Sequence, residues 1–468
     1  MTEKPQVSSG TQQRGFASFS VRIREMLNKI ARDRPAQLAL LIFAVIIFVF
    51  TALLSLPIST ASGKRAKFID AFFTATSSVC VTGLTTVDTA TYWSPVGQFF
   101  ISAGLIIGGL GVMTLAAILG RAVSRHVGLT QRMLTAEENQ SSLGDVGAIV
   151  RAVLIVSLTA HSILLISLLP FFLNKGEPLL ASLSHSYFMA VSIFNNGGFV
   201  AMREGVLPYV GNWGLTIPVI FGTIAGAIGF PVVLDMWRHR TRPRKWSITT
   251  KIVLVTYISL LILGAVAFAA IEWNNPNTLG QLSTAGKINA SLSLSTVTRS
   301  TGLATLDVGQ MGETSWLLIS TLMFIGGGSA SAAGGIKVTT FAILLLAIRA
   351  EARGDRDTEV FGKRLPPEVL RLAISATFAG TVMVGTGCVA LLQMTNFSFS
   401  QILVEVISAF ATCGLSTGIT SALPFGAKLV LILLMFFGRT GIMTLAAALA
   451  LRSRRRTIRL PEERPLIG

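Results

Sequence analysis

Long apolar runs separated by short polar stretches dominate this sequence. Runs of about 20 residues or more, enough to cross ~30 Å of hydrocarbon as a helix, occur near 37–58, 96–119, 147–173, 211–236, 252–272, 315–347, 369–394 and 425–451. The pattern therefore predicts an all-α polytopic membrane protein with eight transmembrane spans. The first run is too long for the core of a signal peptide and has no small-residue cleavage site, so we expect it to remain as a helix.

The polar stretches between these runs are of two kinds. Some are basic, whereas the others hold a short, partly apolar segment followed by a glycine-containing stretch. Four such segments occur: 70–81 before TGLTT, 185–194 before NNGGFV, 290–298 before RSTGLA and 401–411 before TCGLSTG. About ten residues are too few to span the bilayer but enough for a half-crossing helix, so each segment predicts a re-entrant loop.

The four glycine stretches recur at a regular interval. With Gly83, Gly198, Gly302 and Gly414 taken as equivalent, the intervals are 115, 104 and 112 residues. GGLGVMTLAA at 108–117 and GRTGIMTLAA at 438–447 share most positions, and 226–233 and 332–339 are weaker counterparts. The sequence thus predicts four tandem M1-P-M2 repeats (helix, re-entrant pore half-helix plus filter, helix) around a central pore.

The repeats also define the expected boundaries along the chain. The predicted segments are an N-terminal arm 1–36, repeat 1 over 37–119, a loop 120–146, repeat 2 over 147–236, a basic loop 237–251, repeat 3 over 252–348, a loop 349–368, repeat 4 over 369–452 and a basic tail 453–468. The filters are expected near 81–85, 196–200, 300–304 and 412–416.

The distribution of charge supports this topology. The chain of 468 residues is 51% hydrophobic and 13% charged, against about 25% charged in soluble domains. Its formal charge of +17 could suggest nucleic acid, but the basic residues gather in the arm, alternate loops and tail, without an aromatic-basic patch. The positive-inside rule places these segments, and both termini, in the cytoplasm. We expect them to contact anionic membrane lipid and no nucleic acid.

The glycine stretches carry the chemistry. Backbone outside a helix cannot face lipid, because each unpaired N–H or C=O costs several kcal/mol there, so it must line a wet path. Four such stretches around one axis would form rings of carbonyl oxygens that replace the water shell of a cation. Half-helices with their C-terminal ends at the axis would add partial negative charge. For Asp70 and Glu405, an outer negative field and an ordinary cap or satisfied polar contact both stay open.

The motifs VTGLT, NNGGF, RSTGL and TCGLSTG, in this order, resemble the four filters of the Trk/Ktr/HKT superfamily of potassium transporters. The resemblance covers residues 37–452 and, with eight spans, is closest to the KtrB membrane subunit. It implies that K+ is bound by backbone carbonyls of the filter residues Val81, Thr82, Gly83, Leu84, Asn196, Gly197, Gly198, Phe199, Ser300, Thr301, Gly302, Leu303, Thr412, Cys413, Gly414 and Leu415. Gly83, where sodium uniporters of the superfamily carry serine, argues for potassium.

A glycine-rich run interrupts the third post-filter helix. At about 1 kcal/mol per glycine it cannot be an ordinary helix, so we expect a break. The resemblance implies an intramembrane gating loop over 326–336, made of Gly326, Gly327, Gly328, Ser329, Ala330, Ser331, Ala332, Ala333, Gly334 and Gly335 and followed by Lys337. A phosphate loop is disfavoured because GxxxxGK[ST] is not met around Lys337.

Arg439 is a charge inside the last apolar run. Its counterparts in the other repeats, Gly109, Ala227 and Ala333, are uncharged. Charged residues in membranes are costly and usually functional. The resemblance implies that Arg439 forms a barrier beneath the filter, and we expect Lys337 to play a similar part. An ion pair that locks helices together stays open for Arg439.

The resemblance also implies partners and a location. It predicts a homodimer with one pore per subunit, a cytosolic KtrA- or TrkA-like regulatory ring that binds nucleotides, and the cell membrane of a prokaryote. No organic cofactor is expected on this chain. Whether transport is channel-like or coupled to Na+ or H+ stays open.

Two other functional classes fit the sequence less well. An enzyme is disfavoured because the four histidines are scattered, no HExxH or paired-carboxylate set lies in the spans, and Cys80, Cys388 and Cys413 form no CxxC. A secondary transporter of another cation, built from inverted repeats, is the remaining alternative. Repeats with two full spans each would share one orientation, which favours a pore.

Overall fold

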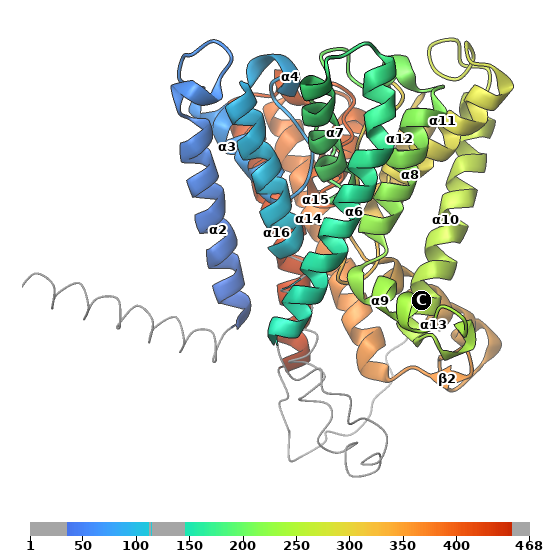
Figure 1. Ribbon diagram of the computed structural model, residues 1–468. Coiled ribbons are helices and arrows are strands. Elements are labelled where there is room, and N and C mark those ends of the chain that lie inside the picture. Colours follow the sequence, from blue (N-terminus) through green and yellow to red (C-terminus); the bar gives the residue numbers. More distant parts are fainter. Residues whose placement is uncertain (1–34, 112–113, 115–145, 452–468) are drawn as a thin grey trace, which may run out of the picture.

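The computed structural model describes residues 35–111, 114 and 146–451. Nearly all of the predicted N-terminal arm 1–36 and of the loop 120–146, most of the last residues of repeat 1 and the basic tail lie outside these residues. Figure 1 shows that the described part is a bundle of helices, with one small antiparallel hairpin of β1 (Glu359–Val360) and β2 (Lys363–Arg364) at its lower end.

A long helix followed by a shorter helix recurs four times along the chain. The long helices are α2 (Pro35–Leu54), α6 (Val146–Asn174), α10 (Ile248–Glu272) and α14 (Pro367–Met394). The short helices are α3 (Phe68–Val79), α7 (Leu179–Phe194), α11 (Thr284–Val297) and α15 (Phe399–Phe410). The helices that follow are Pro95–Gly111, α8 (Trp213–Ala227) with α9 (Phe230–Arg238), α12 (Glu313–Phe324) with α13 (Val338–Arg353), and α16 (Phe425–Leu451).

Short helical turns complete the connections between these elements. They are α4 (Thr89–Tyr92) and the 3-10 helices η1 (Pro57–Ser59), η2 (Leu207–Tyr209), η3 (Pro243–Lys245), η4 (Val308–Gln310) and η5 (Thr420–Ala422).

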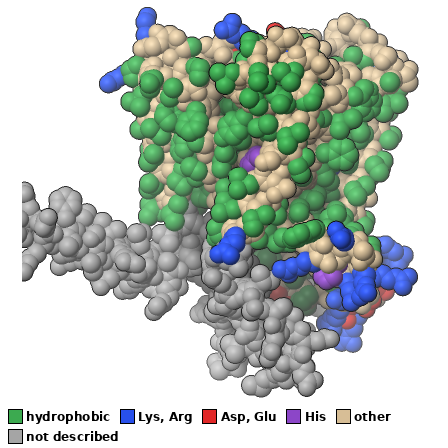
Figure 2. All heavy atoms as spheres, in the orientation of Figure 1, with side chains coloured by type: hydrophobic (Ala, Val, Ile, Leu, Met, Phe, Trp, Pro, Cys, Tyr) green, Lys and Arg blue, Asp and Glu red, His purple; other side chains and the backbone are tan. Residues whose placement is uncertain are grey.

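An apolar belt surrounds the bundle. Large side chains such as Phe48, Ile166 and Phe378 are 60%, 68% and 71% exposed, and Figure 2 shows hydrophobic side chains covering the upper part of the visible face while many Lys and Arg gather near its lower end. Apolar exposure on this scale marks a surface made for lipid. Among the described residues, Val150–Asn174, Ile248–Glu272 and Pro367–Met394 are long and apolar enough to cross a membrane, with α8 and α9 as a fourth span if taken together.

The short helices lie in the upper half of the bundle (Figure 1). They end within two residues of the predicted half-helices, but α7 and α11 begin six residues earlier than expected. Ser283 caps α11, and Ser398 forms a capping box with Gln401 at the start of α15. These caps satisfy N-terminal amides that the apolar pattern alone does not reveal.

Two of the helices that follow the glycine stretches are broken. The run 315–347 stops being helical between Phe324 and Val338, as its glycines predict. The run 211–236, predicted to be continuous, instead bends by 95° between α8 and α9. Gly229 has φ +91° and Pro231 follows it in the first turn of α9, so an uninterrupted helix cannot pass this point.

Candidate functional site

The four predicted glycines share one backbone conformation. The φ angles of Gly83, Gly198, Gly302 and Gly414 are +93°, +64°, +60° and +104°. L-residues with a side chain rarely adopt this region, whereas glycine enters it freely. We call the stretches 81–85, 196–200, 300–304 and 412–416 glycine segments one to four.

Three of the segments carry a second unusual residue two positions earlier. Val81, Asn196 and Thr412 have φ angles of +56°, +59° and +45°. Positive φ is uncommon for non-glycine residues and is a genuine outlier for β-branched ones. The backbone therefore turns sharply at the end of each of these three short helices, and the surrounding packing holds it there.

The four segments meet in a closed ring. A Cβ atom added at any of the four glycines would lie closer than 3.0 Å to a carbonyl oxygen of the neighbouring segment: Gly83 to Gly197, Gly198 to Thr301, Gly302 to Cys413 and Gly414 to Thr82. In every case the oxygen belongs to the residue that precedes the neighbouring glycine. The ring thus brings four carbonyl oxygens and four glycines together and leaves no room for a side chain.

Hydroxyl side chains support this backbone. The amide of Gly83 donates to Ser77 Oγ at 3.0 Å, and the amide of Gly414 donates to Ser408 Oγ at 3.0 Å. Both serines lie six residues before their glycine, and the equivalent positions hold Ser192 and Thr296. These residues are not among the predicted site residues, although each segment has a hydroxyl residue six positions before its glycine.

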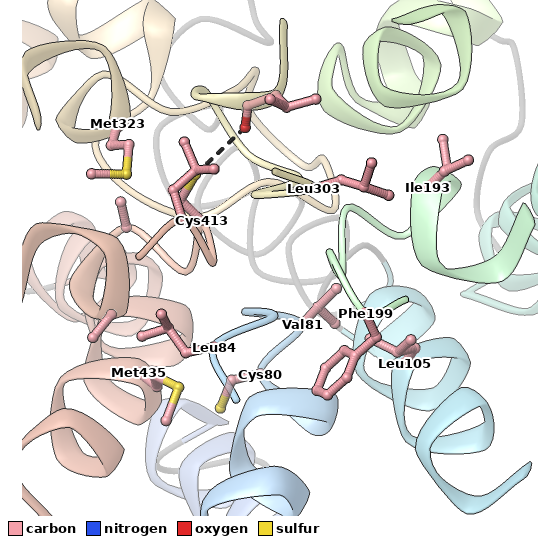
Figure 3. Close-up of a cluster of buried hydrophobic side chains, with 14 of the residues drawn as sticks. Cys80, Val81, Leu84, Leu105, Ile193, Phe199, Leu303, Met323, Cys413 and Met435 are labelled. Carbon is pink, nitrogen blue, oxygen red and sulfur yellow. Dashed lines mark hydrogen bonds between the residues drawn. The ribbon is translucent and has the colours of Figure 1, made fainter. Parts of the chain in front are cut away.

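The residue after each glycine anchors the ring in the surrounding core. These residues are all large, apolar and at most 1% exposed: Leu84, Phe199, Leu303 and Leu415. Figure 3 shows the side chains of Leu84, Phe199 and Leu303 pointing toward the surrounding helices. The ring therefore presents backbone to its centre and hydrophobic side chains to its outside.

The short helices end directly behind the ring. A Cβ at Gly108, Gly226 or Gly438 would collide with the carbonyl oxygen of the last residue of a short helix: Val79, Phe194 and Phe410. Glycine at these positions lets the following helix approach that end closely. The C-terminal end of a helix carries partial negative charge, so three helix ends packed in this way favour a cation at the ring.

The broken stretch between α12 and α13 is tied at one side to the bend between α8 and α9. The amide of Gly328 donates to Ala227 O at 2.7 Å, and the amide of Ala332 donates to Gly226 O at 3.1 Å. At its other side, a Cβ at Gly334 would collide with Thr412 Oγ1. Residues 326–336, the gating loop predicted above, therefore lie against glycine segment four.

Two basic side chains donate hydrogen bonds to consecutive carbonyls of this loop. Arg439 Nη1 donates to Ala332 O, and Lys337 Nζ donates to Ala333 O at 2.6 Å. Arg439 is only 4% exposed. In the described part of the chain no carboxylate lies within 4.0 Å of Arg439, so the helix-locking ion pair left open above is not found there.

Two buried carboxylates, Asp70 and Glu405, lie on the short helices α3 and α15. Asp70 accepts a hydrogen bond from Thr86 Oγ1 at 2.8 Å and lies 3.7 Å from Lys428 Nζ. Glu405 accepts from Thr420 Oγ1 at 2.8 Å and from the amide of Thr417 at 3.2 Å, as well as from Ser416 Oγ. Both carboxylates therefore make satisfied polar contacts, one of the two alternatives left open by the sequence. Both accept hydrogen bonds from residues at or just after the end of a glycine segment.

An apolar belt around a buried ring of backbone carbonyls defines an integral membrane protein of the transport class. Residues 25–455 match the family model described as TrkH: Cation transport protein, and the chain belongs to this family. The family and its named members are ion transporters, which confirms the prediction that the chain is not an enzyme.

The similar proteins extend over almost the whole chain. It is 35% identical to the Ktr system potassium uptake protein B of Bacillus subtilis (strain 168), over 95% of this chain and 99% of that protein. It is 33% identical to the potassium/sodium uptake protein NtpJ of Enterococcus hirae, over 95% and 100%. The crystal structure of the potassium transporter TrkH from Vibrio parahaemolyticus shares the fold, with a TM-score of 0.70 and 16% identity over 88% of this chain and 84% of that one.

Proposed function

We propose that this chain is the potassium-translocating membrane subunit of a Ktr/Trk-type uptake system. The closed ring of the four glycine segments carries this proposal. Carbonyl oxygens gathered from four segments in one ring can replace the hydration shell of K+, and the helix ends behind them favour a cation over an anion. The names of the relatives, which are potassium or potassium/sodium uptake proteins, support the choice of ion.

In this proposal the chain forms four M1-P-M2 repeats with eight spans, and each glycine segment is one quarter of the selectivity filter. The recurrence of a long helix, a short helix and a further helix supports this division. Both termini lie in the cytoplasm of a prokaryotic cell, as the positive-inside rule predicts.

The loop 326–336 is the gate in this proposal. Its contact with Thr412 and its hydrogen bonds to Arg439 and Lys337 would close the path beneath the ring. Opening would require the Arg439 side chain to release Ala332 O. A buried arginine beneath a cation path also opposes the passage of the ion for as long as it stays there.

The proposal includes partners that the chain does not itself contain. Relatives named as components of a Ktr system support a separate regulatory chain. We propose that this chain is a cytosolic ring that binds nucleotides, that the transporter is a homodimer, and that its basic loops contact anionic lipid. A relative named for both potassium and sodium makes the effect of Na+ on uptake part of the test.

Uptake of rubidium or potassium by a bacterium that lacks its own potassium uptake systems tests the proposal. Cells with the wild-type chain should accumulate the ion from micromolar to millimolar medium, and Gly83→Ser should lower the rate and raise the sensitivity of uptake to Na+. The added side chain would enter the ring beside Gly197 O.

Two results would count against the proposal. A wild-type chain that reaches the membrane without restoring potassium uptake would refute the function. Uptake that Gly83→Ser leaves unchanged in both rate and sodium sensitivity would refute the assignment of the ring as the filter.

A further inference from the structure

A half-buried histidine, His161, lies behind glycine segment two. Asn195, fully buried directly before this segment, has its side-chain nitrogen 3.0 Å from Val191 O and 3.0 Å from His161 Nε2 on α6. A carbonyl only accepts hydrogen bonds, so the amide nitrogen, not the oxygen, must lie on this side. His161 Nε2 is therefore the acceptor, and the imidazole is neutral with its proton on Nδ1, which lies 3.4 Å from Ser157 Oγ.

The equivalent position before glycine segment three holds an arginine. Arg299 is fully buried, and its Nη1 donates to Tyr257 O on α10 at 2.8 Å. Its guanidinium carbon lies 3.4 Å from the centre of the Tyr257 ring, which attracts the cation through its face. Within the described residues Arg299 has no carboxylate partner, and the Tyr257 hydroxyl has no hydrogen-bond partner. The ring and the backbone carbonyl, not the hydroxyl, therefore make this contact.

The same position in the other two segments carries short side chains, Cys80 and Ala411. Neither can reach an outer helix as Asn195 and Arg299 do. Segments two and three are thus each tethered outward, to the long helix that begins their own repeat, whereas segments one and four are not tethered in this way.

We propose that His161 and Tyr257 are positioning residues that set the discrimination of the ring between K+ and Na+. This inference rests on the proposed function. Na+ is smaller than K+, so carbonyl oxygens must move toward the centre of the ring to coordinate it. A tether that runs outward from the ring opposes this movement in segments two and three and keeps the ring at the size that suits K+.

Paired variants separate the effect of losing the tether from the effect of changing the volume of the side chain. His161→Phe keeps an aromatic ring against Phe194, whose centroid lies 5.0 Å from that of the imidazole, but removes the acceptor. His161→Gln replaces the ring nitrogen with an amide oxygen of similar reach. Tyr257→Leu removes the aromatic face, whereas Tyr257→Phe removes only the unpartnered hydroxyl. Ser167→Ala, which loses a bond within α6 to Leu164 O, is a control away from the ring.

The experiment measures Na+ and Rb+ uptake in the same potassium-uptake-deficient cells and reports their ratio, which does not depend on how much transporter is present. His161→Phe and Tyr257→Leu should raise the Na+/Rb+ ratio about three- to tenfold, the effect expected for loss of one buried polar contact. His161→Gln, Tyr257→Phe and Ser167→Ala should leave the ratio near that of the wild type. If His161→Phe does not reach the membrane, His161→Leu takes its place.

The outcomes are distinct. An unchanged ratio in His161→Phe and Tyr257→Leu, or an equal change in Tyr257→Phe, would overturn the inference while leaving potassium uptake established. A wild-type chain that takes up neither ion would instead refute the proposed function.

Discussion

Glycine segments two and three differ from segment four in what lies behind them. All three contribute a glycine with positive φ and the carbonyl oxygen of the residue before it to the ring. Segments two and three are joined to the long helices α6 and α10 through Asn195 and Arg299, whereas segment four lies against the loop 326–336. A ring with a positive-φ glycine in every segment can thus have an asymmetric support, with two segments joined to long helices and one segment against the loop that we propose as the gate.

The largest expected effect comes from adding a side chain to the ring, and it tests whether all segments of the ring are equivalent. Gly302→Ala and Gly414→Ala should each reduce rubidium uptake about a hundredfold or more, because each adds backbone strain and a collision with a neighbouring carbonyl. The loss should be similar in tethered segment three and untethered segment four. Initial uptake rates at equal amounts of membrane-inserted protein measure it.

Gly63→Ala is the matched control for this prediction. Gly63 has φ +67°, but a Cβ there would meet no atom within 4 Å. Alanine at this position therefore keeps the strain and omits the collision, and uptake should stay within about threefold of wild type. A segment that accepted alanine without loss would show that its glycine does not belong to a closed ring.

A smaller effect is expected for the loop 326–336, the proposed gate. Arg439→Ala removes the hydrogen bond to Ala332 O, and loss of a charge-assisted bond should raise uptake about five- to tenfold by favouring the open loop. The Na+/Rb+ ratio should not change, since the tethers of segments two and three stay intact. Uptake of both ions over time provides the measurement.

Arg371→Gln serves as the control for Arg439→Ala, because it removes an arginine from the exposed surface of α14. It should leave uptake unaltered. A fall in uptake with Arg439→Ala, together with a changed ion ratio, would mean that Arg439 supports the ring and does not restrain the loop.

The smallest effect concerns the pair that joins repeats one and four. Lys428→Met removes a partner that lies 3.7 Å from Asp70 in a partly buried site, and Asp70 keeps its bond from Thr86. We expect a loss of about 1 kcal/mol in stability and an unchanged ion ratio. Thermal unfolding of the purified protein in detergent measures the first, and paired uptake the second. A shift in the ion ratio as large as that of His161→Phe would show that segment one is tethered as well.

The glycine segments and the broken loop could be predicted from the sequence because both depend on residue type at fixed positions. A glycine that needs positive φ has no substitute, and a run such as 326–335 cannot form a stable helix. Both requirements can therefore be recognised from the residue types in the sequence. The placement of Gly83, Gly198, Gly302 and Gly414 in one closed ring is consistent with the expectation drawn from their spacing.

The tethers could not be predicted, because they depend on which side chains the packing brings together. Asn195 and His161 are 34 positions apart, and nothing in either neighbourhood marks them as partners. Arg299 lies in a polar stretch of the sequence, where a charged side chain is expected to be exposed, yet it is fully buried. The bend at Gly229 had a local signal that was missed, since Pro231 follows directly in the first turn of the next helix.

The covalent continuity of the ring has a genetic consequence. Because one reading frame encodes all four segments, a single codon change alters one quarter and leaves three as they were. A ring assembled from four identical subunits would receive every substitution four times over. The position three residues before each glycine is an example, because the four segments hold Cys80, Asn195, Arg299 and Ala411 there. Each segment can thus change its contacts with the surrounding helices while the backbone ring stays the same.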